Sequence, residues 1–100
     1  MKYVYQIVLK HVTINGTGSV TSTNFSDYIK AMEGVKDAME FAWQYYGVSK
    51  DYFNEIHNVA GWIWKELGYV RAWKAITDDD ICTIDLYRIK LDNDEMEKWL

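Results

Sequence analysis

The chain of 100 residues contains no proline and a single cysteine, Cys82. One thiol cannot form a disulfide within the chain, which is typical of proteins from a reducing compartment. Apolar runs are also short: none approaches the about 18 residues of a membrane span, and Gln6 and Lys10 interrupt the apolar start of the chain. These absences predict a cytoplasmic protein that does not interact with membranes.

An excess of basic charge is missing as well. Eleven Lys and Arg residues face fifteen Asp and Glu residues, for a net charge of −4. The basic residues are scattered, so neither the overall field nor a local cluster attracts a phosphate backbone, and we expect no direct binding to nucleic acid. At this length the chain is one domain, 1–100, with an acidic tail, 92–98, that is expected to fray.

Residues that carry chemistry are few. Cys82 with His11 or His57 would make a thiol nucleophile and its base. However, Cys82 alternates with apolar Ile84 and Leu86, which favours a buried structural thiol. The two histidines and the cysteine do not have the spacing of metal ligands.

The glycines form no nucleotide-binding motif either, because "GTG" at 16–18 lacks a third glycine and a following Gly-Lys-Ser/Thr. We therefore predict no catalytic, cofactor-binding or metal-binding residues, and a protein that is not an enzyme. The alternative is an enzyme or small-ligand binder whose site is not recognisable from sequence.

Three consecutive aspartates, 78–80, stand between two apolar segments. A calcium loop of the EF-hand type requires oxygen ligands at alternate positions, a glycine and a glutamate at position twelve. Here Cys82 occupies an alternate position, the glycine is missing, and Ile89 stands at position twelve. Aspartate is favoured in turns because its side chain bonds nearby backbone groups. The triplet therefore indicates a turn.

Four segments have the β-branched and aromatic composition of strands. Residues 3–14 and 19–23 flank the Asn-Gly turn signal of 15–18, and the small polar residues of 19–23 suggest an edge strand. Residues 69–76 and 81–91 flank "TDDD" and indicate a second hairpin.

Helical periodicity appears in the middle of the chain. Residues 33–46, which end before Gly47, place one set of apolar residues on a common face: Val35, Ala38, Met39, Ala42, Trp43 and Tyr46. The start of this helix is less defined, since Ser26 or Asp27 also fits and Gly34 intervenes. A second helix is predicted over 50–67, capped by Ser49, and a strand over 61–67 is the competing interpretation. The resulting fold class is α+β, in the order β-β-α-α-β-β, with a four-stranded antiparallel sheet and both helices on one of its faces.

Aromatic residues make up 16% of the chain. Most are expected in the core, but Trp62 projects from the polar side of the second predicted helix, where it either packs under a loop or anchors a partner. Glu33, Asp37 and Glu40 form an acidic stripe on the first helix, which is a solvated surface or a mimic of phosphates. These four residues are the candidate partner-binding residues.

The segments "KDAMEFAWQYYG" and "DDDICTIDLYRIKL" resemble parts of small acidic accessory proteins carried by bacteriophages and mobile elements of Gram-positive bacteria. Some proteins of that kind, anti-CRISPR proteins among them, bind and block a host defence enzyme. The resemblance implies a protein partner of that type and assigns no functional residue.

The sequence thus predicts a small acidic, non-enzymatic protein-interaction domain, an accessory protein that inhibits a host nucleic-acid-binding or defence protein. A self-associating structural subunit is the main alternative, with the N-terminal strand pairing edge to edge and Trp62 in a two-fold interface.

Overall fold

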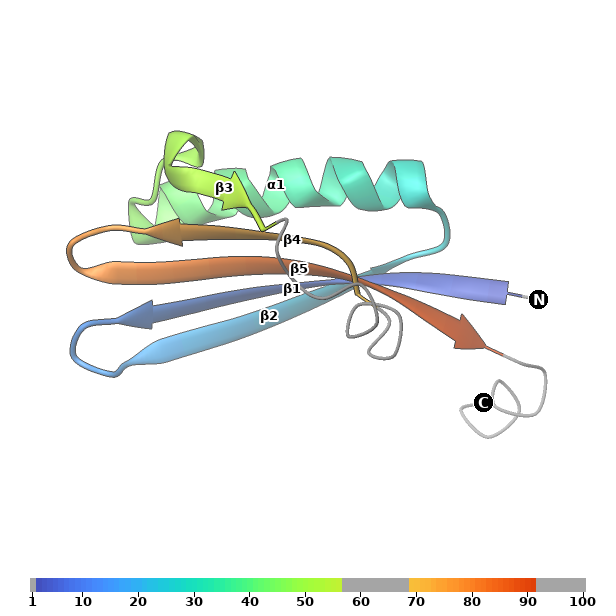
Figure 1. Cartoon of the computed structure of the whole chain (residues 1–100), viewed down its shortest axis with the longest axis horizontal. Coiled ribbons are helices and arrows are strands. Elements are labelled where there is room, and N and C mark those ends of the chain that lie inside the picture. The colour runs from blue at the N-terminus through green and yellow to red at the C-terminus, as the bar shows by residue number, and fades with distance from the viewer. Residues whose placement is uncertain (1, 57–68, 92–100) are drawn as a thin grey trace.

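The computed structural model describes residues 2–56 and 69–91. In these ranges the chain forms one five-stranded sheet, a long helix over it and a single 3₁₀ turn (Figure 1). The elements are β1 (Lys2–Thr13), β2 (Gly18–Phe25), α1 (Tyr28–Tyr46), η1 (Lys50–Tyr52), β3 (Phe53–Glu55), β4 (Tyr69–Ile76) and β5 (Asp80–Leu91).

All strand pairs are antiparallel, and the order across the sheet is β2-β1-β5-β4-β3. The long central pair, β1 with β5, runs from Lys2 opposite Leu91 to Thr13 opposite Asp80. From Tyr5 to Val12, β1 is paired on both sides and is therefore a central strand, so the expectation that the N-terminal strand pairs edge to edge is wrong over this length. Among the described strands, β2 and β3 form the two edges of the sheet.

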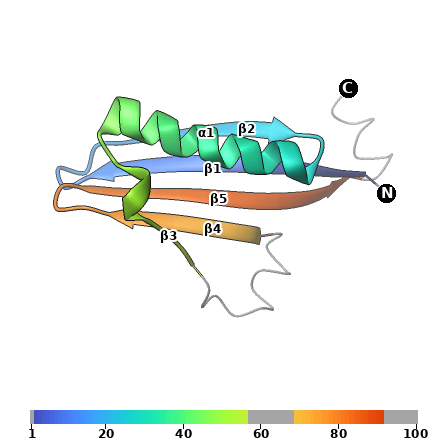
Figure 2. The same ribbon diagram turned by 90° about the horizontal axis from the view of Figure 1, so that it is seen from above.

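Both predicted hairpins are confirmed, and their turns lie at the same end of the sheet (Figure 2). In the first, the Gly16 N–H donates to Thr13 O and the Thr13 N–H donates to Thr17 O. Gly16 has a φ of 83°, which glycine adopts without steric cost. In the second, the Thr77 N–H donates to the carbonyl of Asp80, so Asp78 and Asp79 form the turn, as expected, and Asp80 begins β5.

The predicted fold class is wrong in two respects, since the described chain has one α-helix instead of two and five strands instead of four. The Ser49 hydroxyl accepts from the Asp51 N–H, but this cap begins only a 3₁₀ turn. Residues Phe53–Glu55 then pair with β4, because hydrogen bonds to a neighbouring strand satisfy their backbone N–H and C=O groups as those of a helix would. Several predictions fall outside the described residues: 57–67 of the second helix, the competing strand at 61–67, His57, Trp62 and the acidic tail 92–98.

The helix α1 begins earlier than residue 33, at Tyr28, where the Asp27 carboxylate accepts from the Lys30 N–H at 2.8 Å. Gly34 is retained inside the helix because the helix lies close to the sheet there. A Cβ at this position would stand 2.4 Å from the ring of Phe25 and 2.9 Å from Cδ1 of Ile7. The glycine that made the helix start uncertain from sequence is therefore a packing requirement.

The core lies between α1 and one face of the sheet. It contains mainly aliphatic and small side chains: Ile7, Leu9, Ala31, Val35, Ala42, Val48, Trp73, Ala75, Cys82, Ile84 and Leu86. The helix sits over β1, with β2 and β5 on either side of it (Figure 2). No described element covers the opposite face, which is called here the open face (Figure 1).

Candidate functional site: a groove beside the free edge of β2

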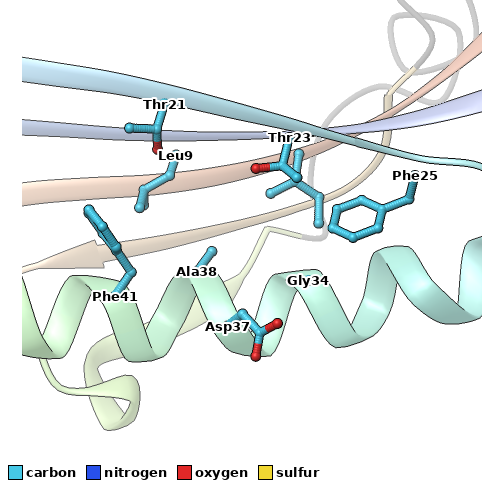
Figure 3. A pocket seen from close by; sticks show the side chains of 9 residues that line it. Leu9, Thr21, Thr23, Phe25, Gly34, Asp37, Ala38 and Phe41 are labelled. Carbon is cyan, nitrogen blue, oxygen red and sulfur yellow. The ribbon is translucent and has the colours of Figure 1, made fainter.

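A groove of about 300 Å³ lies between β2 and α1 (Figure 3). Its floor and walls are mostly apolar, and its polar groups are two threonine hydroxyls on the strand side and one carboxylate on the helix side. The lining residues are Ile7, Leu9, Thr21, Thr23, Phe25, Gly34, Asp37, Ala38 and Phe41. An apolar concavity with a few polar groups is the usual form of a binding site.

The rim of the groove is the free edge of β2, and β2 carries no charged residue along its eight positions. The opposite edge, β3, is three residues long and includes Glu55. Natural sheets usually protect a long edge with charge, proline or a covering element, because its backbone groups otherwise pair with another chain. The edge of β2 has neither charge nor proline, and seven of its eight residues are exposed.

The hydrogen-bond pattern identifies the free backbone groups. In an antiparallel pair, alternate residues bond to the neighbouring strand, and the residues between them point their N–H and C=O groups away. Thr13 bonds to Thr17, so the odd-numbered residues of β2 bond to β1. The backbone groups of Val20, Ser22 and Asn24 consequently point to the free edge.

The acidic stripe predicted on α1 is exposed, as expected for a solvated surface, and the structure places one of its members in the groove. Asp37 lines the groove, whereas Glu33 lies near the start of the helix and Glu40 accepts a hydrogen bond from Gln44. The same helix also carries Lys30 and Lys36, so three carboxylates against two ammonium groups leave it with one net negative charge. One net negative charge on the helix is too little to imitate a row of phosphates.

For one tryptophan of α1, the burial predicted from helical periodicity is wrong. Trp43 was predicted in the core but is 55% exposed. It lines a second groove, of about 700 Å³, with Met39 and Glu40. The predicted buried sector was too wide, because the helix rests on the sheet along its small residues Ala31, Gly34 and Ala42. Trp62, the predicted anchor, lies outside the described residues.

Cys82 and His11 are brought together, since they stand opposite each other on β5 and β1. His11 Nε2 lies 2.6 Å from Asp80 Oδ1, and the imidazole stacks on Tyr46 with ring centroids 3.9 Å apart. This is the order of a thiol, a base and an orienting carboxylate. However, Cys82 is fully buried, and burial, aided by the negative charge of Asp80, raises the pKa of its thiol to about 11. A thiolate is therefore disfavoured at neutral pH, and the cluster joins the two hairpins to α1 as a structural unit.

A second polar cluster ties β4 to β3 and to the start of the helix. The Arg71 guanidinium donates from Nε and Nη2 to the two carboxylate oxygens of Glu55, at 2.6 and 2.8 Å, and lies 5.0 Å from the ring centroid of Trp73. Its Nη1 also donates to the Tyr28 hydroxyl at 3.4 Å. Hydrogen bonds to Glu55 are the main reason why the pKa of Arg71 is raised, so the guanidinium stays charged. A bidentate ion pair of this kind fixes the orientation of the two side chains as well as the distance between them.

Within residues 2–56 and 69–91, no group of three or more His, Cys, Asp or Glu side chains is placed to hold a metal ion. In the same part of the chain, no helix is long and apolar enough to cross a membrane. Comparison of the whole chain with protein-family models, curated proteins and solved structures gives no match.

Proposed function

We propose that this protein is a non-enzymatic interaction domain that binds an extended segment of a partner protein as a sixth strand along β2. The observation that carries the proposal is the long, uncharged, unpaired edge of β2 beside an apolar groove. Strand addition of this type takes its affinity from backbone hydrogen bonds and its specificity from pockets that receive alternate side chains.

The groove restricts the chemistry of the segment. Side chains of an added strand alternate between the two faces of the sheet. Every second side chain therefore points toward the helix, next to Thr21 and Thr23, and enters a groove that suits an apolar group. Asp37 is the one charged residue that lines the groove, so a lysine or arginine close to that apolar residue completes the match. The preferred segment is extended, lacks proline and combines apolar with basic residues.

The resemblance to accessory proteins of bacteriophages supports a host protein as the source of this segment, and a basic segment is common in proteins that bind nucleic acid. Inhibition of such a partner would follow if the captured segment were needed for its own function.

The experiment that tests the function is selection from a library of random ten-residue peptides displayed on phage, with wild type and Ser22→Pro in parallel. The Ser22 N–H points to the free edge, so proline removes a donor for the added strand and leaves the ladder to β1 intact. Enriched peptides should bind wild type and the matched control Ser22→Ala, and should lose at least tenfold in affinity for Ser22→Pro.

Asp37→Asn supplies the second arm of this experiment. We expect a loss of about three- to tenfold, confined to peptides with a basic residue, since a partly exposed ion pair contributes about 1 kcal/mol. Peptides that bind Ser22→Pro as tightly as wild type, or a selection that enriches no sequence, would contradict strand addition at β2. Circular dichroism of each variant establishes that the fold is intact.

A further inference from the structure

The open face of the sheet carries its own pattern of side chains, independent of the groove. Three cross-strand rows follow one another away from the hairpin turns. The apolar row comprises Val12, Ile81 and Ile76, the lysine row comprises Lys10, Thr83 and Lys74, and the aspartate row comprises Val8, Asp85 and Ala72.

The apolar row is unusual for a surface in contact with water. Val12, Ile81 and Ile76 are 45%, 44% and 62% exposed and lie side by side on three adjacent strands. Contiguous exposed aliphatic groups with a charged border commonly mark an interaction site.

The charges next to the apolar row are self-complementary. Lys10 and Lys74 flank Thr83 in one row, and Asp85 occupies the centre of the next. Burial raises the pKa of Asp85, while the charge of Lys10 and the hydrogen bond from the Tyr87 hydroxyl act in the opposite direction. We propose that a second copy of this chain packs face to face on the open face, with each Asp85 between Lys10 and Lys74 of the other copy.

The charges also select the symmetry axis of the dimer. A two-fold axis parallel to the strands would lay one lysine row on the other, and like charges at an interface repel. A two-fold axis perpendicular to the strands, between the lysine row and the aspartate row, lays each lysine row over the partner's aspartate row. Asp85 then faces Thr83 of the second copy, and the two flanking ammonium groups lie one strand to either side.

The available area is enough for a weak dimer. Four strands about 4.8 Å apart, each contributing about eight residues of 3.4 Å, present roughly 500 Å² per copy, or roughly 1,000 Å² in all. Specific protein interfaces bury at least about 1,000 Å² in total, so we expect a dissociation constant in the micromolar range. The helix lies on the opposite side of the sheet and does not obstruct this contact (Figures 1 and 2).

A charge exchange followed by sedimentation velocity tests the dimer. Asp85→Lys gives the face three ammonium groups, and the double variant Lys10→Asp/Lys74→Asp gives it three carboxylates. Each variant alone should be monomeric, with a dissociation constant at least tenfold higher than that of wild type. An equimolar mixture of the two should form a one-to-one dimer, because the opposite faces again match.

Two controls isolate the open face. Ile29→Lys changes an exposed residue on the outer side of α1 and should leave the dimer unchanged. Asp37→Asn, which changes the groove on the opposite side of the sheet, should alter the dimer by less than threefold, so failure of strand addition and failure of the dimer give different results. A wild type that stays monomeric at hundreds of micromolar, a dimer that both charge variants retain, or a mixture that stays monomeric would each overturn the proposal.

Discussion

The two faces of the sheet are formed by the same strands but differ in burial and in the placement of charged side chains. On β5, Ile84 faces the helix and is completely buried, while Ile81, three residues earlier, faces the other way and is 44% exposed. The covered face excludes charge from its centre and places its polar groups in two closed clusters at the ends. The open face mixes aliphatic side chains with Lys10, Lys74 and Asp85. The covered face therefore holds the fold together, and the open face is free to vary with function.

The largest expected effect comes from truncating one isoleucine on each face. Ile84→Ala removes a fully buried side chain, and we expect a loss of about 2–5 kcal/mol in the free energy of unfolding. Ile81→Ala should cost less than about 1 kcal/mol in dilute protein, where the chain is monomeric. Urea unfolding of both variants measures the difference. Equal losses would show that the open face is covered in the monomer.

A second prediction uses pH to test the burial of Cys82. The folded pKa of about 11 lies above the ordinary value of 9.0, so the thiol stabilises the fold below pH 9, and this contribution is lost as pH rises toward 11. Relative to Cys82→Ala, wild type should lose about 2–3 kcal/mol of stability between pH 9 and 11. Ionisation of the tyrosines affects both proteins and cancels in the comparison.

Native Cys82 should also be unreactive toward a thiol reagent at pH 7.5 until the protein unfolds. Rapid modification of the folded protein would contradict this result and would revive the reading of Cys82, His11 and Asp80 as a nucleophilic site.

The smallest effect is expected for Gly34→Ala, which probes how closely the helix rests on the covered face. Alanine gains about 1 kcal/mol in helix propensity but forces Phe25 and Ile7 to move, and overpacking costs about 1–3 kcal/mol. The net result should be a loss of about 1–2 kcal/mol, seen as a lower melting temperature. Glu33→Ala, one residue away and exposed, is the matched control and should change stability by less than about 0.5 kcal/mol. A more stable Gly34→Ala variant would mean that Phe25 moves aside at no cost.

Sequence reasoning about the site succeeded where the information was local. The period of α1 placed Glu33, Asp37 and Glu40 on its exposed side, and the small polar residues of 19–23 indicated an edge strand. It failed for the groove, because the groove is made by side chains of β1, β2 and α1 that meet only in the folded chain. It failed for Trp43 because helical periodicity predicts only a wide apolar side of the helix. It does not predict the narrower strip of that side that contacts the sheet.

The sequence by itself determined the two hairpins, their turns, the long helix and the burial of Cys82, because each depends on residues close together in the chain. Only the tertiary structure decided that 53–55 joins the sheet, that β1 is central, and that Asp80 meets His11 across 69 positions. The physical reason is that strand order and groove shape follow from which surfaces bury one another. That choice is made among distant segments, where local propensity has little influence.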